Sequence, residues 1–151
     1  MLAKNIVFSI VASVATLFII GDSPLGQFAY HHPPSFYYAM VSLGFLLVWL
    51  LYGLISGYMR KKHFIKFISV FWGVVGLFGL MGYILPSKIA TATRLAVLAV
   101  PGIALIYGPT YGLGYFLPLN PELPFVLYCL ILLWSSGAIG YLLGYQFKKW
   151  R

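Results

Sequence analysis

Few residues of this chain could take part in chemistry, and they are scattered along it. His31 and His32 stand side by side, nine residues after Asp22. Two imidazoles and a carboxylate could bind a metal ion or transfer protons. Adjacent side chains rarely point at one ion, however, and the two prolines that follow stiffen the chain. The sequence therefore favours a solvated turn here and predicts no metal site.

Arg94 is a second candidate, because it interrupts an otherwise apolar run. A charge inside a membrane segment is costly and usually faces protein or water. Near the outer surface, Arg94 could bind a lipid phosphate or an anionic solute through two parallel hydrogen bonds. His31, His32 and Glu122 are the further candidate ligands on that side. The alternative is structural: the Arg94 side chain reaches the headgroups or pairs with an acidic residue.

The chain carries none of the common catalytic motifs. GxSxG, HExxH and Walker sequences are absent, and the one cysteine, Cys129, excludes any chemistry that needs paired thiols. The apolar runs contain no pair of carboxylates for acid–base catalysis. We therefore predict no catalytic residue and no cofactor, and the sequence favours a protein that is not an enzyme.

Composition places the chain in a lipid environment. Of 151 residues, 62% are hydrophobic and only 8% are charged, and the mean hydropathy is +0.93. Soluble domains are about a quarter charged, and a soluble fold of this size could not bury so much apolar surface. The sequence predicts an all-α integral membrane protein, with residues 1–151 forming a single domain.

Four apolar segments are long enough to cross a bilayer, which takes about 20 helical residues. They cover residues 5–21, 36–58, 64–85 and 125–147. The first has the positive start and apolar middle of a signal peptide. Its small residues lie inside the apolar run, and no A-x-A site follows it. We therefore expect this segment to remain as the first span.

Basic residues predict the orientation of these spans. Eight of the ten basic residues lie on one side of a four-span arrangement: Lys4, Arg60, Lys61, Lys62, Lys66, Lys148, Lys149 and Arg151. Because such loops stay in the cytoplasm, we expect a multi-pass protein of the cell membrane with both termini cytoplasmic. The net charge of +8 then lies on the cytoplasmic face, so it implies no nucleic-acid partner.

Residues 86–124 contain six of the nine prolines. Segment 89–117 is apolar but broken at Pro101 and Gly102, because proline cannot donate a backbone hydrogen bond and glycine loosens the chain. We expect this segment to be re-entrant from the outer side, or to lie flat on the outer interface. The alternative is a fifth, kinked helix over residues 89–107, which would place the C-terminal tail outside.

Glycines recur at helical spacing in three of the spans. They are Gly53 and Gly57, then Gly73, Gly76, Gly79 and Gly82, and finally Gly140 and Gly144, the first and last pairs being GxxxG motifs. Small residues at this spacing let two helices approach closely, which drives helix packing in lipid. The pattern fits packing inside the bundle, or contact of one glycine face with another subunit.

These features predict a small non-catalytic polytopic membrane protein. We expect it to act in the lipid bilayer as a subunit or accessory of a membrane complex, contacting a membrane-protein partner or further copies of itself through its glycine-bearing helices. The alternative is a transporter or pore component for a small anionic solute or lipid, which would use the broken segment 89–117 and Arg94.

Overall fold

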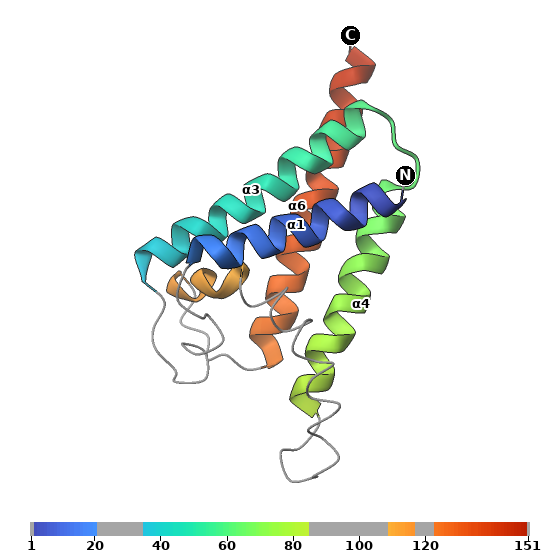
Figure 1. Ribbon diagram of the computed structural model, residues 1–151. Helices are drawn as coiled ribbons and strands as arrows, with labels where there is room; N and C mark the ends of the chain where they lie inside the picture. The colour runs from blue at the N-terminus through green and yellow to red at the C-terminus, as the bar shows by residue number, and fades with distance from the viewer. Residues whose placement is uncertain (1, 21–34, 85–108, 117–122, 151) are drawn as a thin grey trace.

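The computed structural model describes residues 2–20, 35–84, 109–116 and 123–150, and these residues are helical apart from short turns (Figure 1). The elements are α1 (Leu2–Ile20), α3 (Phe36–Tyr58), α4 (Phe64–Ile84), the short 3-10 helix η1 (Tyr111–Tyr115) and α6 (Leu123–Trp150). The prediction of an all-α chain is confirmed for the described residues. The bounds of α3 are those predicted, and α6 runs a few residues further at each end.

Two of the described helices are long and apolar enough to cross a membrane. They are α3 and the part of α6 that covers Leu127–Trp150. The other two long helices contain shorter apolar stretches, Lys4–Thr16 in α1 and Phe64–Phe78 in α4. By length and composition, these helices are compatible with a membrane protein.

The α3 and α6 helices form the centre of the bundle and cross obliquely in the same direction (Figure 1). The α1 helix lies antiparallel to α3, and the Phe8 ring stacks on Tyr52 with 4.0 Å between centroids. The α4 helix lies antiparallel to α6, and the Phe64 ring stacks on Tyr141 at 5.5 Å. Both outer helices therefore run opposite to the central pair.

Aromatic side chains fill the space where α1, α3 and α4 meet. The indole of Trp49 is fully buried and packs edge-on against Trp72, with ring centroids 5.1 Å apart. Phe8 approaches the same indole from α1, and Phe71 approaches it from α4. The two edge-to-face pairs, Trp49 with Trp72 and Trp49 with Phe8, add to the stabilisation from their buried area. This cluster connects α1 and α4 to the central pair.

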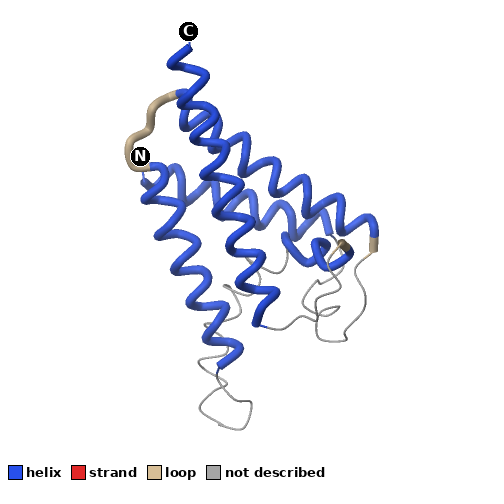
Figure 2. Tube along the Cα trace, turned by 180° about the vertical axis from the view of Figure 1, so that it is seen from behind, coloured by secondary structure: helices blue, strands red, loops and turns tan. Residues whose placement is uncertain are grey.

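A short turn links α3 to α4 and ends α3 in a Schellman motif (Figure 2). The Arg60 amide donates to the Gly57 carbonyl, and the Lys61 amide donates to the Ser56 carbonyl. Arg60 has a φ of 52°, the left-handed conformation that glycine usually supplies at this position. The turn brings four consecutive polar residues, 60–63, to the end of the bundle where α4 begins.

Candidate functional site

The α3 and α6 helices meet backbone to backbone through their glycines. A Cβ atom at Gly53 would overlap the carbonyl oxygen of Gly137, and one at Gly57 would overlap the carbonyl oxygen of Tyr141. Only a residue without a side chain permits this approach. The GxxxG pair of α3 is therefore used inside the bundle.

The glycines of α6 make the reciprocal contact and show the relative direction of the helices. A Cβ atom at Gly140 would overlap the carbonyl oxygen of Leu50, and one at Gly144 would overlap that of Leu54. A step of four residues toward the C-terminus of α6 therefore matches a step of four residues toward the C-terminus of α3. The two GxxxG pairs interlock in a parallel helix pair.

The glycines of α4 differ from one another. A Cβ atom at Gly76 would lie 2.8 Å from Leu130 Cδ1, so Gly76 packs on α6. A Cβ atom at Gly73 would meet nothing within 4 Å. Gly79 and Gly82 lie further along α4, beyond the residues whose surroundings the structure describes. Among the described α4 glycines, only Gly73 faces outward.

Gly73 belongs to an exposed strip that we call the α4 outer face, formed by Lys66, Val70, Gly73 and Leu77. Their spacing of four, three and four residues places them on one side of the helix. Val70 is 58% exposed and Leu77 is 60% exposed. Gly73 makes a shallow notch between these two apolar side chains. Apart from Lys66 at one end, the strip has no polar side chain.

The η1 helix packs against α3 below its first turns. The Gly112 amide donates to Ser42 Oγ at 3.0 Å, and a Cβ atom at Gly112 would overlap the Tyr38 carbonyl oxygen. Ser42 lies six residues into α3, which is about 9 Å along the axis. Pro109 and Thr110, which precede η1, are fully buried. Residues 109–113 are thus buried against the bundle at the level of Ser42 in α3.

The basic side chains of the described residues gather at the opposite end of the bundle. The start of α1, the α3–α4 turn and the end of α6 all lie there (Figure 1). Arg60 lies over the Tyr145 ring at 5.6 Å, and Lys148 lies over the Tyr58 ring at 5.5 Å. These cation–π contacts connect the α3–α4 turn to the end of α6.

The predicted ligand residues Arg94, His31, His32 and Glu122 lie outside the described residues, as do Pro101 and Gly102 of the predicted break. Within residues 2–20, 35–84, 109–116 and 123–150, no group of three His, Cys, Asp or Glu side chains could hold a metal ion. The same part of the chain contains no acidic residue. Its charged side chains are therefore all basic.

Hydrogen bonds between helices use residues that sequence reasoning did not single out. Ser136 Oγ donates to the Leu46 carbonyl at 2.7 Å, and Trp134 Nε1 donates to Ser69 Oγ at 2.9 Å. Tyr52 donates its hydroxyl proton to Asn5 Oδ1. Polar residues inside apolar helices are the sequence signal for such contacts. The first bond joins the two helices of the central pair, and the other two hold α4 and α1 to that pair.

No protein-family model, curated protein or solved structure matches this chain. Its function must therefore be inferred from the contacts and exposed surfaces described above.

Proposed function

We propose that this chain is a small non-catalytic, multi-pass membrane protein that serves as a subunit or accessory of a membrane complex and docks through the α4 outer face. The observation that carries the proposal is the notch at Gly73. The GxxxG glycines of α3 and α6 pack against each other's backbone, whereas Gly73 is open between Val70 and Leu77. In lipid, an open small residue is where a second helix packs best.

The apolar exterior supports the membrane placement. Only 33% of the apolar stretch in α3, and the same share in α6, is buried inside the bundle. Large apolar side chains are exposed on all four long helices, among them Val7, Val11, Leu47, Leu51, Val70, Leu77, Ile131 and Leu142. In water, a protein with such a surface would aggregate, whereas lipid solvates the exposed apolar side chains. The basic side chains at one end complete the pattern of a membrane protein.

The parallel direction of α3 and α6 supports the four-span arrangement. If α3 runs from the outer side to the cytoplasm, α4 returns outward, and α6 must run inward again to lie parallel to α3. Residues 85–122 then begin and end on the outer side. A fifth span in that segment would reverse α6 and make it antiparallel to α3. The buried residues 109–113, near the start of α3, fit a re-entrant segment protected by protein.

Cysteine labelling tests this topology. After Cys129→Ala, we introduce Lys62→Cys, Lys149→Cys or Phe116→Cys, each at an exposed position. A membrane-impermeant maleimide should label Phe116→Cys in intact cells. It should label Lys62→Cys and Lys149→Cys only after permeabilisation, because both lie on the basic side. Labelling of Lys149→Cys in intact cells, with Lys62→Cys protected, would instead support the five-span arrangement.

Docking through the α4 outer face is tested by Gly73→Leu. A Cβ atom added at Gly73 meets nothing within 4 Å in the bundle, so the variant should fold while its association weakens. We expect at least about a tenfold rise in the dissociation constant, equivalent to about 1.4 kcal/mol. Size-exclusion chromatography with light scattering in mild detergent, combined with mass spectrometry of co-purifying proteins, measures the change.

Gly44→Leu is the matched control, because Gly44 is a glycine on α3 at which an added Cβ atom would meet nothing within 4 Å. It should leave association unchanged. Wild-type protein that is monomeric and free of partners in mild detergent would contradict the proposed role. Equal association of the Gly73→Leu variant and wild type would place the docking surface elsewhere.

A further inference from the structure

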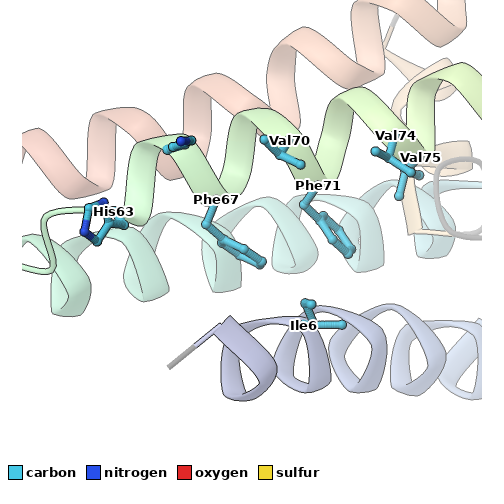
Figure 3. A pocket seen from close by; sticks show the side chains of 8 residues that line it. Ile6, His63, Phe67, Val70, Phe71, Val74 and Val75 are labelled. Carbon is cyan, nitrogen blue, oxygen red and sulfur yellow. The ribbon is translucent and has the colours of Figure 1, made fainter.

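A groove of about 470 Å³ lies along α4 and includes Ile6 of α1 in its lining (Figure 3). Phe67, Phe71 and Val74 line it from α4. Figure 3 shows Phe67 and Phe71 projecting from α4 on the side of α1, with Ile6 opposite them. Its volume is within the range of about 300–1,000 Å³ that is usual for sites binding small molecules.

The groove has one basic end and otherwise apolar walls. His63 and Lys66 line it at the beginning of α4, next to the α3–α4 turn. From there its α4 lining extends to Val75, about 14 Å along the helix axis. No acidic side chain occurs in the described residues to neutralise Lys66. A cationic end above an apolar trough complements a molecule with an anionic head and a hydrocarbon tail.

We propose that this groove binds an acyl chain of an anionic phospholipid from the cytoplasmic leaflet, with the headgroup phosphate at Lys66 and His63. The inference rests on the membrane placement proposed above, which puts the basic end at the leaflet that carries anionic lipid. The groove borders the α4 outer face and shares Lys66 and Val70 with it, but its floor is formed by other residues. Phe67 and Phe71 lie about a quarter of a turn or more around α4 from Lys66.

The charge, and not the apolar wall, should provide the selectivity. Every membrane lipid offers hydrocarbon, and surrounding lipid is as apolar as the groove, so Phe67 and Phe71 favour no particular headgroup. An ammonium group beside the phosphate distinguishes a lipid with net negative charge from a zwitterionic one. The site should therefore discriminate by headgroup and respond weakly to chain length.

Photo-cross-linking tests the site. The full chain is placed in phosphatidylcholine nanodiscs that contain phosphatidylglycerol with a diazirine on one acyl chain. We expect saturable adducts on the α4 peptide that contains Phe67–Val75 and on the peptide that contains Ile6. Unlabelled phosphatidylglycerol should compete for these adducts, and added phosphatidylcholine should not. The same measurement with a diazirine phosphatidylcholine gives the headgroup preference.

Two variants separate the charge from the trough. Lys66→Gln should lower the preference for phosphatidylglycerol about fivefold, which is the effect of one basic residue near the membrane surface. Val74→Trp should fill the groove and remove the saturable adducts for both lipids. The matched controls are Lys149→Gln, a lysine at the same end of the bundle on α6, and Val48→Trp on the exposed side of α3. Neither control should change the labelling of the groove.

Equal labelling by both lipids, unchanged in Val74→Trp, would overturn the site. Stronger competition by palmitate than by phosphatidylglycerol would also overturn it, since the occupant would then be a free fatty acid. Adducts on the exposed sides of α3 and α6 distinguish the two proposals. If they form while the groove is unlabelled, the membrane placement stands and the lipid site fails. If no helix is labelled, the membrane placement fails as well.

Discussion

Replacing Gly57 with leucine is expected to separate α3 from α6 and to destabilise the folded bundle strongly. Even a single Cβ atom at Gly57 would overlap the Tyr141 carbonyl oxygen. Because that oxygen is helix backbone, the clash can be relieved only by moving the two helices apart. We expect a loss of more than about 3 kcal/mol, at the upper end of the cost of overpacking.

Cys129 provides the measurement. Its thiol lies on α6 and is fully buried, so a maleimide reaches it only when the bundle opens. The rate of Cys129 modification in detergent should rise at least about a hundredfold in Gly57→Leu, the factor that corresponds to about 3 kcal/mol. Gly144→Leu should behave alike, because its Cβ would overlap the Leu54 carbonyl from the other side. Gly44→Leu, at an open position, should react at the wild-type rate. A wild-type rate in Gly57→Leu would contradict the interlocked helix pair.

Replacing Gly112 with valine is expected to expel η1 from its position against α3 while the four long helices remain. A side chain at Gly112 would overlap the Tyr38 carbonyl and break the bond from the Gly112 amide to Ser42 Oγ. Hydrogen exchange followed by mass spectrometry should show protection of residues 110–115 falling at least about tenfold, for an expected cost of about 1–3 kcal/mol. Protection within α3 and α6 should change little.

Ser42→Ala gives a graded version of the same test. It removes the acceptor of the Gly112 amide without adding volume, so the loss of protection should be smaller than in Gly112→Val. Phe116→Ala, at an exposed position directly after η1, serves as the control and should keep wild-type protection. If the Gly112→Val variant also kept wild-type protection from hydrogen exchange, η1 would not be anchored through Gly112 and Ser42.

The positions of the long helices could be predicted from the sequence because apolar runs and their polar boundaries determine them locally. The α3 helix shows this most clearly. Pro34 precedes it, the basic turn that begins at Arg60 follows it, and its bounds agree with the prediction. The glycine spacing also indicates close helix packing. These features need only neighbouring residues to be recognised.

The pairing of the glycines could not be predicted in the same way. Gly73 and Gly76 belong to one regular series, yet Gly76 packs on Leu130 whereas Gly73 is open. Their difference depends on where α6 lies. The contact of Gly140 with Leu50 likewise joins positions about ninety residues apart, so it depends on the path of the chain between them.

The anion-binding prediction shows a related limit. Arg94 stands out because a charge is conspicuous inside an apolar run, and it lies outside the described residues. Lys66 sits near the end of a span, where the sequence alone makes it only a marker of orientation. Its place at the end of a groove depends on how α1 and α4 pack. The proposed role of Lys66 thus depends on a neighbouring helix that is distant in the sequence, so no local sequence pattern predicts it.

The interlocked glycines of α3 and α6 also have a consequence for biosynthesis. The ribosome finishes α3 about ninety residues before it finishes α6, a delay of roughly 5–18 s at about 5–20 residues per second. Throughout that interval, the surface of α3 around Gly53 and Gly57 has no partner from its own chain. Another nascent helix with small residues, including α6 of a neighbouring copy, can occupy it first. When many copies are synthesised close together, domain-swapped pairs should therefore form more often. When synthesis is slow and copies are far apart, each chain should pair its own α3 with its own α6.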